Sequence, residues 1–222
     1  MKILIAIPCM DQVATPFMQS LLSLRHVGEV QYICAAGSLV YESRNRLAQY
    51  TINSGFDCVL FLDSDMTFEP DILIRLVESI EGRDFVTGLC FSRHAPRYRP
   101  CIYKRLGYEI DQNEMRLIDE TYYEYPEGEI FEVEGSGMAC ALIRTKVLET
   151  VLKQKGLPFS PIIGFGEDLS FCIKARQCGF RLYCNSDIRI GHVGTVIIDE
   201  EVFKGNYYGN FKQYQSSAED QP

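Results

Sequence analysis

The sequence predicts an α/β fold in which a mostly parallel sheet is flanked by helices and carries a small antiparallel insertion. Strand and helix patterns alternate through the first half of the chain, as in parallel sheets whose strands are joined by crossover helices. Residues 59–62, Val-Leu-Phe-Leu, are continuously apolar, as expected for a strand that is buried on both faces. Residues 92–128 lose the alternation and carry weak strand patterns separated by turns, which indicates the insertion.

The first half of the chain should alternate between strands and amphipathic helices. The helix over 15–24 has apolar side chains at helical spacing, with Thr15 as its N-cap. The helix over 70–80 should begin with Pro70, because proline fits the first helical turn, and Gly82 follows its end. The expected strands cover 2–8, 30–36, 56–62 and 84–91, and the expected helices cover 15–24, 39–52 and 70–80.

The second half should contain the insertion, two further helices and a last strand. Basic residues are concentrated at 93–105 and acidic residues follow them, a segregation that a solvated antiparallel segment explains most simply. After it, apolar character returns over 131–143, and we expect helices over 146–154 and 167–178, a glycine- and proline-rich loop over 158–166 and a strand over 181–185. The expected organisation is one domain over 1–195, with the insertion at 92–130, and a partly disordered tail over 196–222.

The composition is that of an ordinary globular protein, with 46% hydrophobic and 23% charged residues. The net charge of −8 argues against general binding to nucleic acid, whose backbone is also negative. No stretch approaches the roughly 18 consecutive apolar residues that a membrane span needs. The apolar run at the N-terminus is interrupted at Pro8, too early for a signal peptide.

The nine cysteines indicate a reducing compartment. Their number is odd, and most of them lie inside apolar runs. No C-x-x-C pair is present, which argues against a structural zinc site. Unpaired thiols in this number are typical of proteins that are not exported, so we expect a cytoplasmic location.

Two carboxylates follow the buried strand over 56–62 directly. Asp63 and Asp65 should lie at the carboxyl edge of the sheet, where open α/β folds bind ligands. Two carboxylates placed there cost free energy unless a cation pairs with them, and a hard divalent ion is the natural partner for oxygen ligands. The alternative is an ordinary turn, because aspartate is common in turns and Asp-Ser-Asp occurs often by chance.

Two further centres occur at the ends of expected elements. Glu167 and Asp168 open a helix after a glycine-rich loop, and His192 follows the last strand. Each has a simpler explanation, since acids at a helix N-terminus are favoured by the helix dipole and a single histidine is often a surface residue. The two adjacent acids behind Gly164-Phe165-Gly166 favour a functional site.

The ordered set of these motifs resembles the nucleotide-sugar glycosyltransferases of the GT-A fold, in the broad family 2. The resemblance covers residues 2–194. It is carried by the opening strand that ends at Pro8 and by the segments SRNRLAQ (43–49), FLDSDM (61–66), GSGMACALIR (135–144), GFGEDLSFCIKARQCGF (164–180) and GHVG (191–194).

The resemblance implies a Rossmann-like sheet, a nucleotide-diphosphate sugar as donor, and Mn²⁺ or Mg²⁺ held by a D-x-D motif. By similarity, Asp65 and His192 would be metal ligands, and Asp63 would contact the ribose or reach the metal through water. Asp168 would be the general base of an inverting reaction, and Glu167 would position the acceptor or the donor sugar.

The remaining residues carried over by the resemblance surround the donor. Pro8, Arg44 and Asn45 would bind the donor, with Arg44 suited to pair with phosphate. Gly135 and Gly137 would let the backbone approach the sugar closely. The acceptor would be a glycan, a lipid or a protein, and the basic stretch at 93–105 hints at an anionic one.

Two other functions compete with this expectation. A nucleotidyltransferase making a nucleotide sugar also joins a sheet to metal-binding acids, but the segment after the first strand, IPCMDQVATP, lacks the usual glycine-rich basic loop. A non-catalytic module that binds a nucleotide sugar is the second alternative, and the presence of all three centres speaks against it. The chain departs from the family in having no acid within the second strand, 30–36, to hold the nucleotide base, although Glu29 comes just before it.

Overall fold

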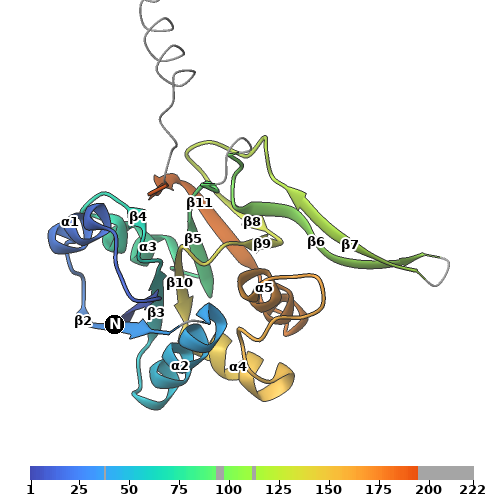
Figure 1. Ribbon diagram of the computed structural model, residues 1–222, viewed down its shortest axis with the longest axis horizontal. Helices are drawn as coiled ribbons and strands as arrows, with labels where there is room; N and C mark the ends of the chain where they lie inside the picture. Colours follow the sequence, from blue (N-terminus) through green and yellow to red (C-terminus); the bar gives the residue numbers. More distant parts are fainter. Residues whose placement is uncertain (38, 94–97, 112–113, 195–222) are drawn as a thin grey trace, which may run out of the picture.

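The protein folds around one large sheet in the computed structural model, which describes residues 1–37, 39–93, 98–111 and 114–194 (Figure 1). Within these residues the sheet has seven strands in the order β2-β1-β3-β10-β5-β11-β8. Five run in one direction, whereas β10 and β8 are antiparallel to their neighbours. The strands are β1 (Lys2–Cys9), β2 (Glu29–Ala36), β3 (Cys58–Leu62), β5 (Phe85–Leu89), β8 (Ile130–Val133), β10 (Cys140–Arg144) and β11 (Leu182–Arg189). The predicted α/β class with a mostly parallel sheet is confirmed.

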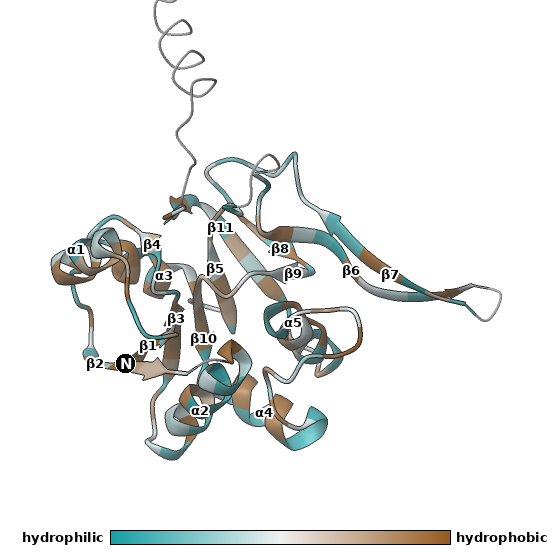
Figure 2. Cartoon of the chain, viewed as in Figure 1, coloured by the Kyte–Doolittle hydropathy of each residue, from teal (hydrophilic) through white to brown (hydrophobic). Residues whose placement is uncertain are grey.

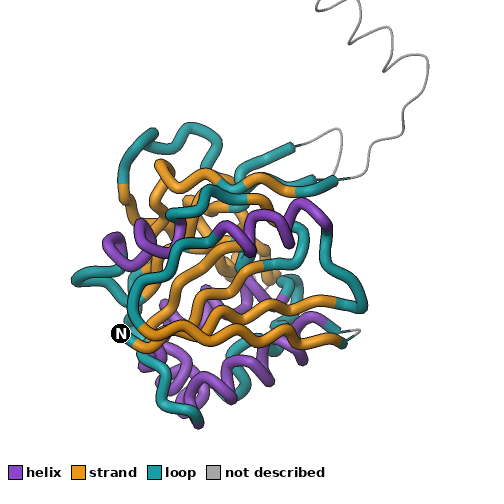
Figure 3. Tube along the Cα trace, turned by 90° about the vertical axis from the view of Figure 1, so that its left-hand side faces the viewer, coloured by secondary structure: helices purple, strands orange, loops and turns teal. Residues whose placement is uncertain are grey.

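Helices cover both faces of this sheet, and each face has its own hydrophobic core. Alternate residues of β1 supply the two cores, Leu4 and Ala6 on one face and Ile3, Ile5 and Ile7 on the other. The first core packs against α2 (Val40–Asn53), α4 (Thr145–Lys155) and α5 (Glu167–Gln177), and the second against α1 (Thr15–Ser23) and α3 (Ile72–Ser79). Figure 2 shows the apolar strands between these layers, and Figure 3 shows helices on both sides of the strands.

The central strand β3 shows why the sequence folds this way. All five of its residues are fully buried, as its continuous apolar run predicts. Its neighbours β1 and β10 shield its backbone on both edges, so every hydrogen-bonding group of the strand lies away from water. The chain leaves the core at Leu62 and immediately reaches the two aspartates.

The starts of helices α1 and α3 differ from the sequence prediction. Helix α1 has Ala14 as its N-cap rather than Thr15, because the Ala14 carbonyl already accepts the first helical hydrogen bond, from Met18 N–H. Helix α3 begins at Ile72 and not at Pro70, because the Pro70 carbonyl accepts the N–H of Arg25 and is lost to the helix.

The predicted antiparallel insertion is confirmed as a long hairpin. Strands β6 (Ile102–Asp111) and β7 (Glu114–Thr121) pair with each other, and β6 also pairs with the short strand β9 (Gly135–Ser136). The hairpin extends away from the body of the protein (Figure 1). The expected tail, 196–222, lies outside the described residues.

A second small sheet was not predicted, and it positions the site. Strand β4 (Met66–Thr67) pairs with β12 (Gly191–His192), so that His192 lies opposite Met66. This pairing brings the end of the last strand beside the acids that follow β3. Among the described residues, no helix is long and apolar enough to cross a membrane.

Candidate functional site

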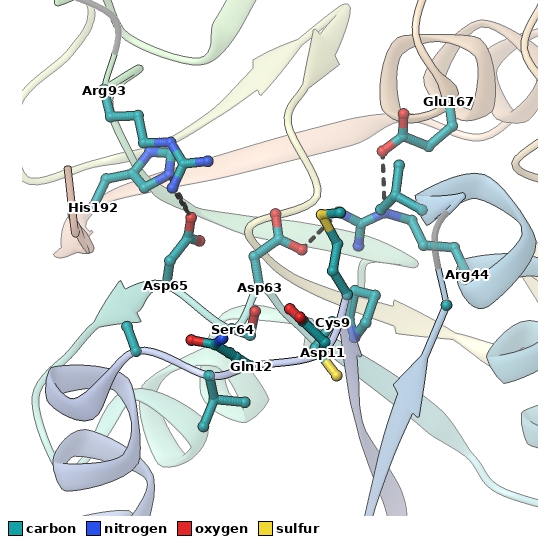
Figure 4. Close-up of a pocket in the computed structure, with 16 residues that line it drawn as sticks. Cys9, Asp11, Gln12, Arg44, Asp63, Ser64, Asp65, Arg93, Glu167 and His192 are labelled. Atoms are coloured by element: carbon teal, nitrogen blue, oxygen red, sulfur yellow. Dashed lines mark hydrogen bonds and ion pairs between the residues drawn. The ribbon is translucent and has the colours of Figure 1, made fainter. Parts of the chain in front are cut away.

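A cavity of about 630 Å³ opens at the carboxyl edge of the sheet, where β1 and β3 end. Its lining combines the end of β1 and the loop that follows it (residues 8–14) with Asp63 and Asp65 after β3, Arg44 of α2, Glu167 of α5 and His192 of β12. Figure 4 shows these polar side chains around a common space, although they come from distant parts of the chain. This is the edge at which α/β folds of this kind bind their ligands.

Asp65 and His192 face each other on one side of the cavity. The distance from Asp65 Oδ2 to His192 Nε2 is 3.4 Å, and both side chains are mostly shielded from solvent. His192 Nδ1 lies 2.9 Å from the carbonyl oxygen of Phe91, which can only accept a hydrogen bond. Nδ1 therefore carries a proton, and in the neutral ring the lone pair of Nε2 points toward Asp65. A histidine oriented through its other nitrogen by a carbonyl is the usual arrangement of a metal ligand.

The contact between Asp65 and His192 shifts the pKa of both side chains. A hydrogen bond to Asp65 raises the pKa of His192, although partial burial opposes the rise. Burial alone would raise the pKa of Asp65, but the hydrogen bond and charge of His192, together with Arg93, lower it below its ordinary value.

On the opposite side, Arg44 joins Asp63 to Glu167. Arg44 Nη2 donates to Asp63 Oδ1 at 2.6 Å, and Arg44 Nε donates to Glu167 Oε1 at 3.3 Å. The side chain of Arg44 is only 3% exposed and lies over the ring of Phe61. Burial alone would lower the pKa of Arg44, but the charges of the two carboxylates outweigh it and raise that pKa.

One nitrogen of this network lacks a partner. Arg44 Nη1 is buried and has no hydrogen-bond partner among the described residues. Leaving a buried charged donor unsatisfied costs free energy, on the order of 1–3 kcal/mol. Arg44 also lines the cavity, so a bound ligand would lie close to this buried donor.

Asp168 lies beside this network, at the N-terminus of α5. Its Oδ1 accepts the N–H of Leu169 at 2.7 Å, which leaves Oδ2 for another partner. Burial raises the pKa of Asp168 to about 6, and the neighbouring charge of Glu167 adds to the rise. A carboxylate with this pKa is suited to take up a proton near neutral pH.

The other residues singled out in the sequence lie in different surroundings. Pro8 lines the cavity at the end of β1. Asn45 does not belong to the lining, and its Oδ1 accepts the N–H of Phe159 at 2.9 Å, so it anchors the loop before α5. A Cβ atom at Gly135 would lie 2.4 Å from Leu106 Cδ2, so that glycine is required by core packing. Gly137 lies beside Asp168, where a Cβ atom would be 3.8 Å from Asp168 Oδ2.

Sequence reasoning missed several polar residues of the cavity, among them Ser64 between the two aspartates. Arg93 forms an ion pair with Asp65, but in the sequence it belongs to a basic stretch that was interpreted as solvated surface. Asp11 and Gln12 line the cavity from the loop after β1 (Figure 4). The position of these residues just past the carboxyl ends of β5, β1 and β3 was the signal that could have revealed them.

The residues present fit a divalent metal ion that also binds a ligand. Asp65 and His192 supply one oxygen and one nitrogen donor on the same side of the cavity, and the orientation of His192 is already fixed. Within the part of the chain that the structure describes, no three His, Cys, Asp or Glu side chains gather into a complete metal cage. An ion held by these two side chains would keep further positions for oxygen atoms of a ligand or water, as Mg²⁺ sites at phosphates do.

Replacing Arg44 by leucine should destabilise the protein by about 3 kcal/mol, because two carboxylates would lose their shared buried partner. Chemical denaturation monitored by circular dichroism measures this change. The control is Arg46→Leu on the same helix, whose exposed guanidinium donates to the carbonyl of Ala36. We expect it to cost less than about 1 kcal/mol. Equal effects of the two substitutions would show that the Asp63–Arg44–Glu167 network does not stabilise the fold.

Comparisons with known proteins identify the family. Residues 7–203 match the model described as "Glycosyltransferase like family 2", whereas a comparison with curated proteins finds no significant match. The fold is similar to that of A197 from STIV, with a TM-score of 0.59 and 24% identity over 90% of this chain and 87% of that chain. It is also similar to GalNAc-T7, crystallised with UDP, GalNAc and Mn²⁺, with a TM-score of 0.57 and 13% identity over 88% of this chain and 44% of that chain. The protein therefore belongs to the glycosyltransferase-like family 2 and is a glycosyltransferase with a fold of the GT-A type.

Proposed function

We propose that the protein transfers a sugar from a nucleotide-diphosphate donor to an acceptor hydroxyl, with a divalent Mn²⁺ or Mg²⁺ ion and with inversion at the anomeric carbon. The observation that carries this proposal is the convergence of Asp65, His192 and the Arg44 network on one cavity. Asp168 does not itself line the cavity, but it follows Glu167 of the lining and feels the charges of Glu167, Arg44 and Asp63. GalNAc-T7, which has a similar fold, was crystallised with UDP, GalNAc and Mn²⁺, and this supports the choice of donor and metal.

In this proposal the metal is held by Asp65 and His192, and when bound it supplies positive charge to the diphosphate of the donor. Pro8, Asp63 and Arg44 contact the donor from the other side of the cavity. Arg44 Nη1, which lacks a partner among the described residues, donates to a donor oxygen. Asn45 supports the site by anchoring the loop before α5. Gly135 supports it by allowing β9 to pack against Leu106.

Asp168 acts as the general base. The acceptor hydroxyl gives its proton to Asp168 Oδ2 while its oxygen attacks the anomeric carbon. The bond between that carbon and the diphosphate oxygen breaks, and the nucleoside diphosphate leaves with the electron pair. A single displacement of this kind inverts the anomeric configuration. Gly137 leaves room beside Asp168, and Glu167, which Arg44 holds, positions the reacting sugar.

The acceptor is a glycan, a lipid or a protein that presents a hydroxyl group. We place the reaction in the cytoplasm, because the odd number of cysteines and the burial of most of them are typical of a reducing compartment.

The release of nucleoside diphosphate from a panel of nucleotide sugars tests the proposal. The purified protein should release nucleoside diphosphate from at least one donor with Mn²⁺, and a chelator should stop the release. Binding of a donor without any release, with and without candidate acceptors, would instead identify a module that only binds nucleotide sugars. Release of pyrophosphate from a nucleoside triphosphate and a sugar phosphate would identify a nucleotidyltransferase.

The pH dependence of turnover follows from the raised pKa of Asp168. The base is active only when it has lost its proton, so kcat should fall as the pH drops below about 6, by about tenfold per unit well below that pKa. Above this pKa the rate should reach a plateau. The profile is measured at saturating Mn²⁺ and donor, so that protonation of His192 does not limit metal binding. The range from about pH 4.5 to about pH 7 spans the titration of this base. A kcat that stays constant over this range would contradict the role of Asp168.

A further inference from the structure

Arg93 occupies a defined position at the edge of the donor cavity. One of its guanidinium nitrogens, Nη1, donates to Asp65 Oδ2, and the same nitrogen lies 3.4 Å from the carbonyl oxygen of Val193. Its Cβ packs closely on Gly194, since a Cβ atom built at Gly194 would lie 3.3 Å from it. Ser92 N–H donates to the carbonyl oxygen of Arg99, and Arg99 N–H donates to Ser92 Oγ, so the segment that carries Arg93 is held at both ends. Arg93 is therefore directed at Asp65 by its surroundings.

The guanidinium and His192 share a single carboxylate oxygen. Asp65 Oδ2 accepts from Arg93 and also lies 3.4 Å from His192 Nε2 (Figure 4). A metal ion bound between Asp65 and His192 must bring its positive charge to that same oxygen. Two positive charges at one oxygen repel each other, so Arg93 weakens the binding of a metal ion at Asp65 and the metal ion weakens the contact of Arg93. Arg93 and the metal therefore compete for Asp65.

Arg93 has room to change its partner. Its side chain is 44% exposed, whereas that of Arg44 on the other side of the cavity is 3% exposed. It also lines a second cavity of about 370 Å³, which shares His192 with the first. An arginine displaced from Asp65 can thus swing while its Cβ stays packed on Gly194. The diphosphate of a bound donor would be the nearest new anion, and a guanidinium binds phosphate oxygens well.

We propose that Arg93 is a donor-binding residue with two partners: it neutralises Asp65 in the metal-free protein, and it binds a diphosphate oxygen once a divalent ion has taken Asp65. This inference rests on the proposed function, because it requires the metal and the diphosphate at this cavity. Arg93 would then help to hold the donor and would add positive charge near the leaving group. The alternative is a structural role, in which Arg93 only ties the loop after β5 to residues 193–194.

The substitution Arg93→Gln separates these roles, because it removes the charge and keeps most of the side chain. Binding of Mn²⁺ alone is measured by the loss of the electron paramagnetic resonance signal of free Mn²⁺. We expect Arg93→Gln to bind Mn²⁺ about fivefold more tightly than the wild type, since a partly exposed ion pair no longer competes.

A second titration measures the diphosphate contact, with the preformed complex of Mn²⁺ and inorganic pyrophosphate as the probe. Calorimetry should show that Arg93→Gln binds this complex about tenfold more weakly, because a charge-assisted hydrogen bond to phosphate is lost. Arg93→Lys keeps the charge and should resemble the wild type in the Mn²⁺ titration. The matched control is Arg105→Gln on the hairpin, which also removes an arginine from an exposed ion pair, with Glu109, and should change neither affinity.

Opposite changes in the two affinities support the proposal, because a purely structural role would weaken both or leave both unchanged. Equal Mn²⁺ affinity of Arg93→Gln and the wild type would overturn this inference and leave the metal site intact. If neither protein bound Mn²⁺, the metal site of the proposed function would fail, and this inference would fail with it. Thermal unfolding of each variant, followed by circular dichroism, shows whether the substituted protein is folded.

Discussion

Replacing Asp168 by asparagine should lower kcat by about a thousandfold, the usual size of a general-base contribution. Asparagine has nearly the same shape, so the N-terminus of α5 should remain in place and the affinity for the donor should change little. The amide cannot accept the proton of the acceptor hydroxyl at neutral pH. Steady-state turnover and calorimetric donor binding, both with Mn²⁺, measure the two quantities separately.

The control for this substitution is Asp187→Asn, which alters an exposed carboxylate that is paired with Arg75 on the protein surface. It should leave kcat and donor affinity unchanged. If Asp168→Asn kept the turnover of the wild type, Asp168 would not be the base. A mechanism that retains the anomeric configuration would then account better for the reaction.

Replacing Asp65 by alanine should abolish metal-dependent binding of the donor. Asp65 supplies one of the two protein ligands proposed for the metal, and its loss also frees Arg93 from its partner. We expect the affinity for the donor with Mn²⁺ to fall by more than about a hundredfold, since even residues behind the ligands typically contribute 10–100-fold to metal affinity. Calorimetry with Mn²⁺ and with a chelator measures the metal-dependent part of the affinity.

Asp71→Ala is the matched control, because Asp71 is a partly exposed aspartate that pairs with Arg25 outside the cavity. Its donor affinity should equal that of the wild type. An unchanged affinity of Asp65→Ala in the presence of Mn²⁺ would show that Asp65 is not a metal ligand, even if the enzyme were active.

The sequence predicts the central strands well because their local pattern and their burial coincide. The apolar run 59–62 predicts a buried strand, and the two aspartates that follow it directly must therefore lie at the edge of the sheet where this strand ends. The direction of β10, in contrast, could not be predicted from the sequence. Its residues, Cys140–Arg144, would suit a buried strand of either direction, and its antiparallel insertion between β3 and β5 depends on contacts far along the chain. No local pattern predicts such a pairing.

Strands of two residues are also beyond prediction from periodicity. Strands β4 and β12 contain only two residues each, too few to show an alternation of apolar and polar side chains. They nevertheless bring His192 to Asp65. The sequence suggested this meeting only through the family resemblance, since the two residues lie in distant parts of the chain.

The polar network of the site illustrates a further limit. Arg44 was expected to pair with phosphate, and the structure shows it between Asp63, 19 positions away, and Glu167, 123 positions away. A sequence gives the charge of such a residue but not which of many opposite charges it meets. Arg93 is similar, because its surroundings in the chain are those of a solvated charged segment and only the folded structure shows its contact with Asp65.

The most direct test of the proposed metal site is to observe the surroundings of Mn²⁺ bound to the protein together with a nucleoside diphosphate. Electron–nuclear double resonance detects phosphorus atoms and nitrogen ligands bound to Mn²⁺. We expect a phosphorus coupling from the diphosphate and a nitrogen coupling that disappears in His192→Ala. Mn²⁺ bound to the nucleotide without any coupling to His192 would contradict a metal site that joins Asp65, His192 and the donor in one cavity.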